Sequence, residues 1–454
     1  MELSSSDIFN AVLIVLSIVA IVVLTAKLKF NVFASLFAMS FILAMCTTPL
    51  DELIGLLKTS FGNTMGGISF IIIFGAIIGI CMERSGAALS IATNILNKAG
   101  KSRAKSAMAM TGFIPGMTIF CDTGYLIMSG IARSFSAQSK TPMPLMAAIL
   151  GLSLFSVHCL VPTHPGALTA ATNLNANIGY LVILGALFSI PALIVGCLWA
   201  NKMSKGMNSA PATLEEEEKK ALDRPLPSFF NSLIPVVLPL ILISISTFTK
   251  ALGFKDEVFA KVIHFIGDPV MALLVGAIAG FCLLAKTQKA NKDKFRLNEV
   301  IEEGIVKAGP ILIITAAGGM FGAVIAATGA GKVFGEALAS SGGASIGLLV
   351  PFIIAVLLKT AQGSSTVAAI TTAGIVAPLL GSLGLDSEWG RMLTVLALGA
   401  GSVVVSHAND SYFWVITKFS NIDINESLRV YSTSTIVMGL VMFACIFVTS
   451  LLVL

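Results

Sequence analysis

Long apolar runs constrain this chain more than any other feature of its sequence. A helix needs about 20 mostly apolar residues to cross the hydrocarbon core of a bilayer. Runs of this kind recur along the whole chain, most clearly at 8–26, 32–50, 233–249, 271–285 and 433–454. Only 12% of the residues are charged, whereas soluble domains average about 25%. The sequence therefore predicts an all-α, polytopic membrane protein and excludes a soluble fold.

Cysteine content and net charge exclude further classes. The seven cysteines lie singly in or beside apolar stretches, without the C-x-x-C spacing of metal or redox sites. We therefore expect no disulfide, no bound metal and no cofactor. The net charge of +5 fits basic cytoplasmic loops better than a nucleic-acid partner. The first apolar run is too long for a signal peptide and lacks a small-residue cleavage site, so we expect it to stay as a span.

The chain reads as two halves, 1–200 and 231–454, joined by the polar segment 201–230. Short matches relate the halves in the same order: 74–79 with 317–322, and 85–87 with 328–330. Lysine and arginine mark cytoplasmic loops. When the apolar runs between the basic segments are counted as spans, the first half begins outside the cell and the second half begins inside. The sequence therefore predicts two inverted-topology repeats, a cytoplasmic linker, and both chain ends on the outer side.

Each half contains a region that is too interrupted for an ordinary span. Residues 107–131 are broken by Pro115-Gly116 and by the polar group 121–124, and residues 346–380 are broken at 359–366. The arms are short enough for re-entrant helical hairpins with their tips inside the membrane. A water-lined break without a ligand is the alternative. Because helix N-termini favour anions, the residues expected to bind substrate at the two tips are Thr123, Gly124, Gln362, Gly363, Ser364, Ser365 and Thr366.

A broken helix is expected after each hairpin, at about 156–166 and 405–411. Three of the four histidines and two aspartates fall in these breaks and in the first tip. Ionisable side chains inside membranes commonly mark ion or proton pathways. The expected proton-coupling residues are Asp122, His158, His407 and Asp410, and the sequence leaves open which of them carries the proton. His164 and Asn409 complete the set expected to bind substrate.

Motifs over nearly the whole chain resemble those of the gluconate permease family, which belongs to the wider ion transporter superfamily. They occupy residues 112–116, 120–125, 158–166, 361–368 and 406–414. The resemblance implies uptake of gluconate, a related sugar acid, glycerate or D-serine, driven by protons across a bacterial inner membrane. It also implies a homodimer in which a transport domain moves like an elevator against a scaffold domain. Cys121, Thr123 and Thr163 depart from the usual family motifs and bear on the choice of substrate.

The resulting hypothesis is symport of protons with a small organic anion such as gluconate. Sodium coupling stays open, because hydroxyls and carbonyls at a hairpin tip can also coordinate that ion. A membrane enzyme lacks support, since no catalytic triad or metal-ligand cluster is recognisable. A channel fits poorly with two inverted halves around a central site. Beyond substrate and ions, we expect lipid and a second copy of the chain as partners, and no nucleic acid.

Overall fold

The computed structural model describes residues 5–24, 28, 30–99, 103–117, 119–207, 225–251, 257–291, 296–328, 344–407 and 410–454, and all regular elements in these ranges are helices. Seven helical stretches within them are long and apolar enough to cross a membrane. Four shorter apolar helices accompany these stretches. The expectation of an all-α polytopic architecture is confirmed.

The first half of the chain forms nine helices in its described residues: α1 (Ser5–Val22), α2 (Val32–Thr47), α3 (Leu50–Arg84), α4 (Ala87–Ala99), α5 (Ala104–Gly116), α6 (Cys121–Ser139), α7 (Met143–Leu160), α8 (Pro165–Asn173) and α9 (Ile178–Met203). Within α5, Pro115 lacks the N–H that would continue the helical ladder, and the helix ends one residue later. Pro165 occupies the first turn of α8, a position that suits a residue without an N–H. The break between α7 and α8 is narrower than the expected 156–166, because α7 stays helical through His158.

The second half continues with α11 (Phe229–Ala251), α12 (Glu257–Ile266), α13 (Pro269–Ala290), α14 (Leu297–Ala327), α16 (Ala344–Gly347), α17 (Leu349–Gln362), α18 (Ser365–Val376), α19 (Glu388–Val403), α20 (Ser411–Phe419), α21 (Ile424–Ser427) and α22 (Thr433–Val453). A 3-10 turn, Ala377–Leu379, follows α18, and a π-helical turn, Leu428–Ser432, precedes α22. Gly363 ends α17 with a φ of 85°, which a residue without a Cβ adopts at no steric cost. Lys359 therefore lies inside a helix, whereas the sequence had suggested that the interruption begins there.

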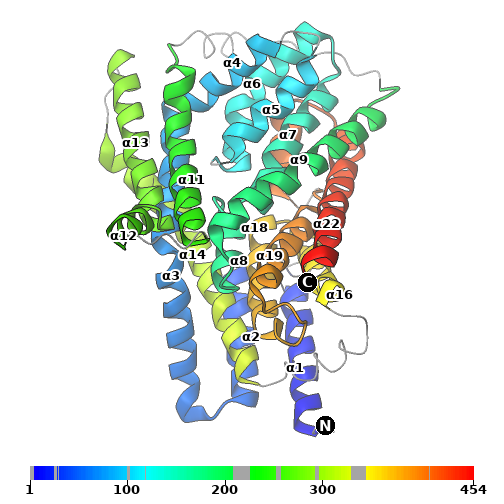
Figure 1. Ribbon diagram of the computed structural model, residues 1–454. Coiled ribbons are helices and arrows are strands. Elements are labelled where there is room, and N and C mark those ends of the chain that lie inside the picture. The colour runs from blue at the N-terminus through cyan, green and yellow to red at the C-terminus, as the bar shows by residue number, and fades with distance from the viewer. Residues whose placement is uncertain are drawn as a thin grey trace.

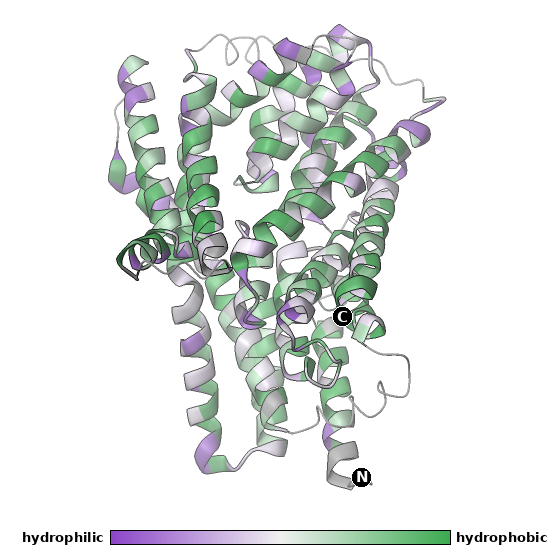
Figure 2. Ribbon diagram, in the orientation of Figure 1, coloured by the Kyte–Doolittle hydropathy of each residue, from purple (hydrophilic) through white to green (hydrophobic). Residues whose placement is uncertain are grey.

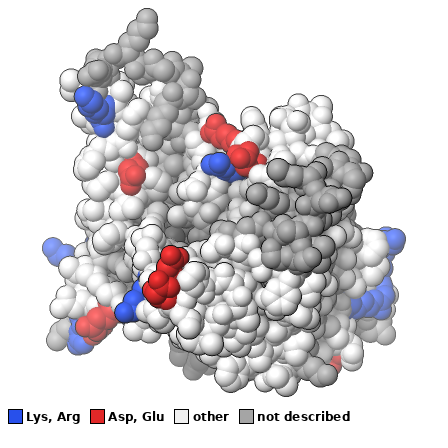
Figure 3. Space-filling view, turned by 90° about the horizontal axis from the view of Figure 1, so that it is seen from below, with Lys and Arg blue, Asp and Glu red and all other residues white. Residues whose placement is uncertain are grey.

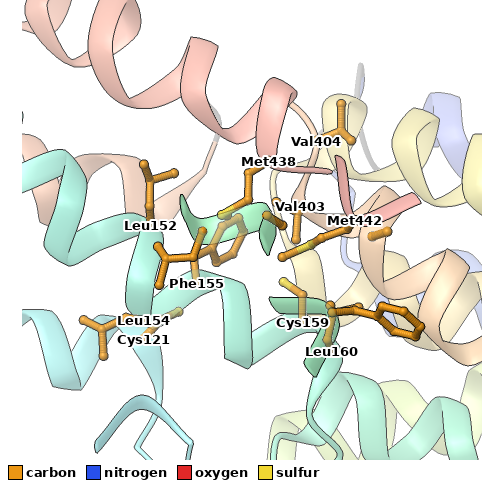
Figure 4. Close-up of a cluster of buried hydrophobic side chains, with 14 of the residues drawn as sticks. Cys121, Leu152, Leu154, Phe155, Cys159, Leu160, Val403, Val404, Met438 and Met442 are labelled. Atoms are coloured by element: carbon orange, nitrogen blue, oxygen red, sulfur yellow. The ribbon is translucent and has the colours of Figure 1, made fainter. Parts of the chain in front are cut away.

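The core of the molecule lies around α7, all 18 residues of which are buried. In Figure 1, α7, α8, α18 and α19 occupy the centre, α11 and α13 lie to one side, and α22 lies to the other. The side chains of Phe155 and Cys159 on α7 pack with Val403 of α19 and Met442 of α22 in one buried apolar cluster (Figure 4). This cluster supports the region where α7, α19 and their continuations break.

The outer helices present apolar side chains to their surroundings. Leu187, Ile194 and Leu198 of α9 are exposed, as are Leu440 and Leu451 of α22. Figure 2 shows hydrophobic residues along most of the molecule, with hydrophilic residues gathered toward the ends of the helices. Seen from below, charged side chains are sparse and scattered (Figure 3). A surface of this kind is suited to contact with lipid.

The longest helices, α3 and α14, pack against each other extensively. At one end of the pair, Arg84 lies 2.6 Å from Glu303, and Lys307 lies 2.8 Å from the same carboxylate. These side chains are partly exposed, so the pairs stabilise the contact by at most about 1 kcal/mol each. The α3–α14 pair stands beside the central helices, and α14 forms one wall of the site described below.

Candidate functional site

A cavity of about 230 Å³ lies where three helices begin. The start of α6 contributes Cys121 and Asp122, the start of α18 contributes Ser364 to Val367, and the start of α20 contributes Asp410 to Tyr412. The remaining wall consists of Phe120, Phe155, His158, Pro310, Ile311, Ile314 and Ile370. The cavity thus combines a polar side made by helix starts with an apolar side contributed mainly by α7 and α14.

Helix starts concentrate backbone N–H groups that have no partner within the helix. Ser364 caps α18 by accepting a hydrogen bond from the N–H of Val367, at 3.3 Å. Asp410 caps α20 in the same way through the N–H of Tyr412, at 3.0 Å. No side chain caps α6, whose N-cap residue is Phe120. Three helix dipoles directed at one cavity favour a bound anion.

Asp410 forms a buried ion pair that the sequence interpretation did not identify. Its Oδ2 lies 2.5 Å from Nζ of Lys359, and the exposed fraction is 0% for the lysine and 5% for the aspartate side chain. The same Oδ2 accepts a hydrogen bond from the hydroxyl of Ser406. Lys359 also donates to the carbonyl of Gly363, at 2.7 Å. A lone lysine in an apolar arm was the signal that could have revealed it, because a buried lysine requires a partner.

Asp122 has a different environment. It lines the cavity at the start of α6, and its Oδ1 is buried without a hydrogen-bond partner among the described residues. The two aspartates, which the sequence could not rank, are therefore distinct: one is fully engaged in polar contacts and the other has an unpaired oxygen.

The predicted histidines take three separate positions. Nε2 of His158 lies 3.4 Å from Oγ1 of Thr366, within the cavity wall. His164 lies behind it, with ring centroids 4.7 Å apart, and its Nε2 is 3.2 Å from the carbonyl of Ile119. His164 lines a separate space of about 10 Å³ instead of the cavity. Nε2 of His407 lies 3.2 Å from the carbonyl of Thr360, also outside the cavity wall.

The other predicted residues divide between the wall and the second layer. Ser364, Ser365 and Thr366 line the cavity, whereas Thr123 and Gly124 do not. A Cβ on Gly124 would lie 2.9 Å from Leu154, so this glycine serves close packing. Gly363 shapes the tip through its backbone. Asn409 and the side chain of Gln362 lie outside the described part of the chain.

The apolar wall from α14 was not expected from the sequence. Pro310, Ile311 and Ile314 belong to a helix that follows neither hairpin, and only tertiary packing brings them to the site. Among the described residues, no group of three or more histidine, cysteine, aspartate or glutamate side chains could hold a metal ion.

Comparison with solved structures supports the fold. The chain aligns with the crystal structure of the YdaH transporter from Alcanivorax borkumensis with a TM-score of 0.66, over 99% of both chains and at 13% identity. At this level of identity, the similarity concerns the fold alone.

Comparison with sequences gives the family. A high-affinity gluconate transporter of Escherichia coli (strain K12) is 29% identical over 93% of this chain and 94% of its own length. The D-serine transporter DsdX of Escherichia coli O6:H1 is 29% identical over 99% of this chain and 100% of its own length. The family described as GntP family permease matches residues 9–452. The resemblance inferred from the motifs is confirmed: the chain is a multi-pass transporter, not an enzyme, and it belongs to the GntP family of permeases.

Proposed function

We propose that this protein imports gluconate, or a related small hydroxy-carboxylate, together with protons. The observation that supports this most directly is the cavity at the starts of α6, α18 and α20, where helix dipoles favour a carboxylate and hydroxyls can bind a polyol chain. Its volume of about 230 Å³ is below the range of about 300–1,000 Å³ that is usual for drug-sized ligands. A small acid fits these properties.

We assign the residue roles from position. Ser364, Ser365 and Thr366 would bind the carboxylate and hydroxyls directly, and Asp122 or Asp410 would carry the proton. The remaining predicted residues, namely Thr123, Gly124, His158, His164, Gln362, Gly363, His407 and Asn409, would shape the site or tune it from positions around the tips.

The architecture proposed for transport is a pair of inverted repeats, 1–200 and 231–454, joined by the cytoplasmic linker 201–230. Its support is the repeated order of elements. A pair of short helices flanking a break (α5 and α6) precedes a broken helix (α7 and α8) and a long helix (α9), and α17 to α20 followed by α22 repeat this order. In this proposal both chain ends face the periplasm of a bacterial inner membrane. The two tips and breaks form a transport domain that moves like an elevator in each half of a homodimer.

Uptake into proteoliposomes containing the purified protein tests the function. Labelled gluconate should accumulate when an inward proton gradient is imposed, and a protonophore should abolish that accumulation. Unlabelled galactonate, glycerate and D-serine, added as competitors, identify the preferred acid. Accumulation that requires sodium and is insensitive to the protonophore would show that sodium, and not the proton, is the coupling ion. Indifference to every acid would overturn the proposal.

D-serine is the second substrate to consider, because the D-serine transporter DsdX matches 99% of this chain. D-serine carries an ammonium as well as a carboxylate. Strong competition by D-serine, with none by galactonate, would favour a binding site that also recognises a cation.

A further inference from the structure

Lys359 lies in the last turn of α17, close to the second tip, with no exposed surface. Its ammonium is 5.4 Å from the centre of the Phe155 ring. It does not line the cavity. A charged group in such a place must be compensated by its neighbours, since an isolated ion is very costly to bury.

The bonds of Lys359 join two segments that border the cavity. It donates to the carbonyl of Gly363, which directly precedes the cavity-lining serines Ser364 and Ser365. It also pairs with Asp410, which starts α20. Because both acceptors lie one residue from cavity-lining hydroxyls, the ammonium fixes the distance between the second tip and the second helix break.

Both carboxylate oxygens of Asp410 are engaged in hydrogen bonds. One carboxylate oxygen accepts from Lys359 and from Ser406, and the other caps α20. Protonating Asp410 would leave the ammonium of Lys359 buried without its counter-ion, which is strongly unfavourable. The ammonium and the carboxylate therefore compensate each other's charge.

Asp122 then decides the charge of the cavity. The titratable groups around it are Cys121 on its own helix, His158 on α7, Tyr412 and Asp410 on α20, and Lys359 on α17. Asp122 and His158 both line the wall with a side-chain atom, Oδ1 and Nδ1, that has no hydrogen-bond partner in the described part of the chain, but only Asp122 is negatively charged when it is unprotonated. With the pair neutral overall, an ionised Asp122 opposes an anionic substrate and a protonated one does not.

We infer that Lys359 is a positioning residue that locks Asp410 in a permanent ion pair, so that Asp122 alone takes up the coupling proton and its protonation admits the anion. The inference rests on the proposed symport of a carboxylate. Lys359 itself makes no contact with substrate. The proton binds to Asp122 first and the carboxylate follows. On the other side of the membrane the carboxylate leaves first and the proton follows, which resets the site.

The Asp122 part of the inference is tested by gluconate binding and transport at several pH values between about 5 and 8. In the wild type, affinity should fall by up to about tenfold for each pH unit above the protonation range of Asp122, because one proton accompanies the anion. Asp122→Asn should bind gluconate with little dependence on pH and keep counterflow exchange, but lose accumulation driven by a proton gradient. Asp51→Asn, an exposed change in the first turn of α3, serves as the matched control.

The Lys359 part is tested by rescue. Lys359→Met should lower both thermal stability and gluconate affinity, the latter by at least about tenfold, because Asp410 loses its counter-ion. Lys359→Met combined with Asp410→Asn should recover most of both, and Lys359→Arg should retain them. Lys58→Met, on the exposed face of α3, is the control. A double variant no better than the single one would overturn the ion-pair role.

The outcomes separate this inference from the proposed function. If the wild type accumulates gluconate but Asp122→Asn does so equally well, the role of Asp122 is wrong while the function stands. If the wild type transports no acid, the function fails, and the stability measurements on the Lys359 and Asp410 variants still decide whether the pair exists.

Discussion

Thr366 lines the cavity, and its hydroxyl also contacts a histidine. Its Oγ1 lies 3.4 Å from Nε2 of His158. Thr366→Val keeps the shape but removes the hydroxyl, and it should raise the KM for gluconate by about 10-fold or more, since an unpaired polar partner remains in the site. Thr366→Ser should retain most of the affinity. Initial uptake rates over a range of gluconate concentrations check this, and equal KM values for the two variants would contradict it.

Ser364 has two functions in the proposal, because it lines the cavity and caps α18. Ser364→Ala removes the cap and should destabilise the protein by about 1 kcal/mol. Ser364→Asp keeps a capping oxygen but adds a negative charge beside the substrate, so stability should be retained while gluconate uptake is lost. Thermal unfolding in detergent, together with uptake in proteoliposomes, separates the two effects. If both variants retained uptake, Ser364 would have no role in binding.

At the scale of single residues, the sequence predicted which residues lie at the site better than it predicted what each of them does. Ser364, Ser365, Thr366, Asp122, His158 and Asp410 were all expected at the site, and all line the cavity. Asp122 and Asp410 looked equivalent because each is an acid in a break of an apolar run. What distinguishes them is Lys359, which is 51 positions before Asp410 in the chain. A contact over that separation depends on how α17 packs against α19, the helix that precedes Asp410, and no local pattern encodes it.

At the scale of helices, the contact between α14 and α18 depends on glycine. A Cβ on Gly374 of α18 would lie 2.5 Å from the carbonyl of Gly318 on α14, and a Cβ on Gly322 would lie 2.3 Å from the carbonyl of Gly374. These close approaches hold α18 against α14, the helix that also supplies the apolar wall of the cavity. Backbone atoms cannot move aside as the end of a flexible side chain can.

Gly374→Ala should therefore push α18 away from α14, with a loss of stability of about 1–3 kcal/mol and a clear fall in uptake. Gly55→Ala is the matched control, because a Cβ there meets nothing within 4 Å. Thermal unfolding and uptake of both variants provide the measurement. Equal behaviour of the two variants would show that the helix contact is not needed for the site.

The breaks between helices were more predictable than the contacts between them. Pro115, Pro165 and Gly363 interrupt helices for reasons that are local to the backbone, so the positions of the tips and breaks could be inferred from the sequence. The wall contributed by α14 could not, since Ile311 and Ile314 lie in an apolar stretch like many others. Which face of such a helix meets the site is decided by tertiary packing.

At the scale of the whole molecule, the arrangement of apolar surface distinguishes two kinds of helix. α7 is buried along its full length, whereas α9 and α22 expose leucine and isoleucine. Buried central helices that break beside a cavity, surrounded by lipid-facing helices, provide a polar site shielded from the bilayer. In the proposed symport, such a site would open to one side of the membrane at a time.

The proposed inverted repeat makes a prediction about sidedness. Lys140 lies between the first hairpin and α7, and Asp386 occupies the corresponding place between the second hairpin and α19; both are exposed. In an inverted repeat these positions face opposite sides, so Lys140→Cys should react with a membrane-impermeant maleimide only from the cytoplasm and Asp386→Cys only from the periplasm. A direct repeat would place both on one side.

Right-side-out and inverted membrane vesicles provide the measurement. The native thiols that are exposed or half-buried are first replaced by serine so that only the introduced cysteine reacts at the surface; they are Cys46, Cys197, Cys282 and Cys445. Labelling of Asp386→Cys in right-side-out vesicles and of Lys140→Cys in inverted ones supports the inverted arrangement, in which the two tips enter the bilayer from opposite faces and meet at the cavity. Labelling of both from the same face would rule out that arrangement and, with it, the proposal that the two tips enclose the substrate from opposite sides.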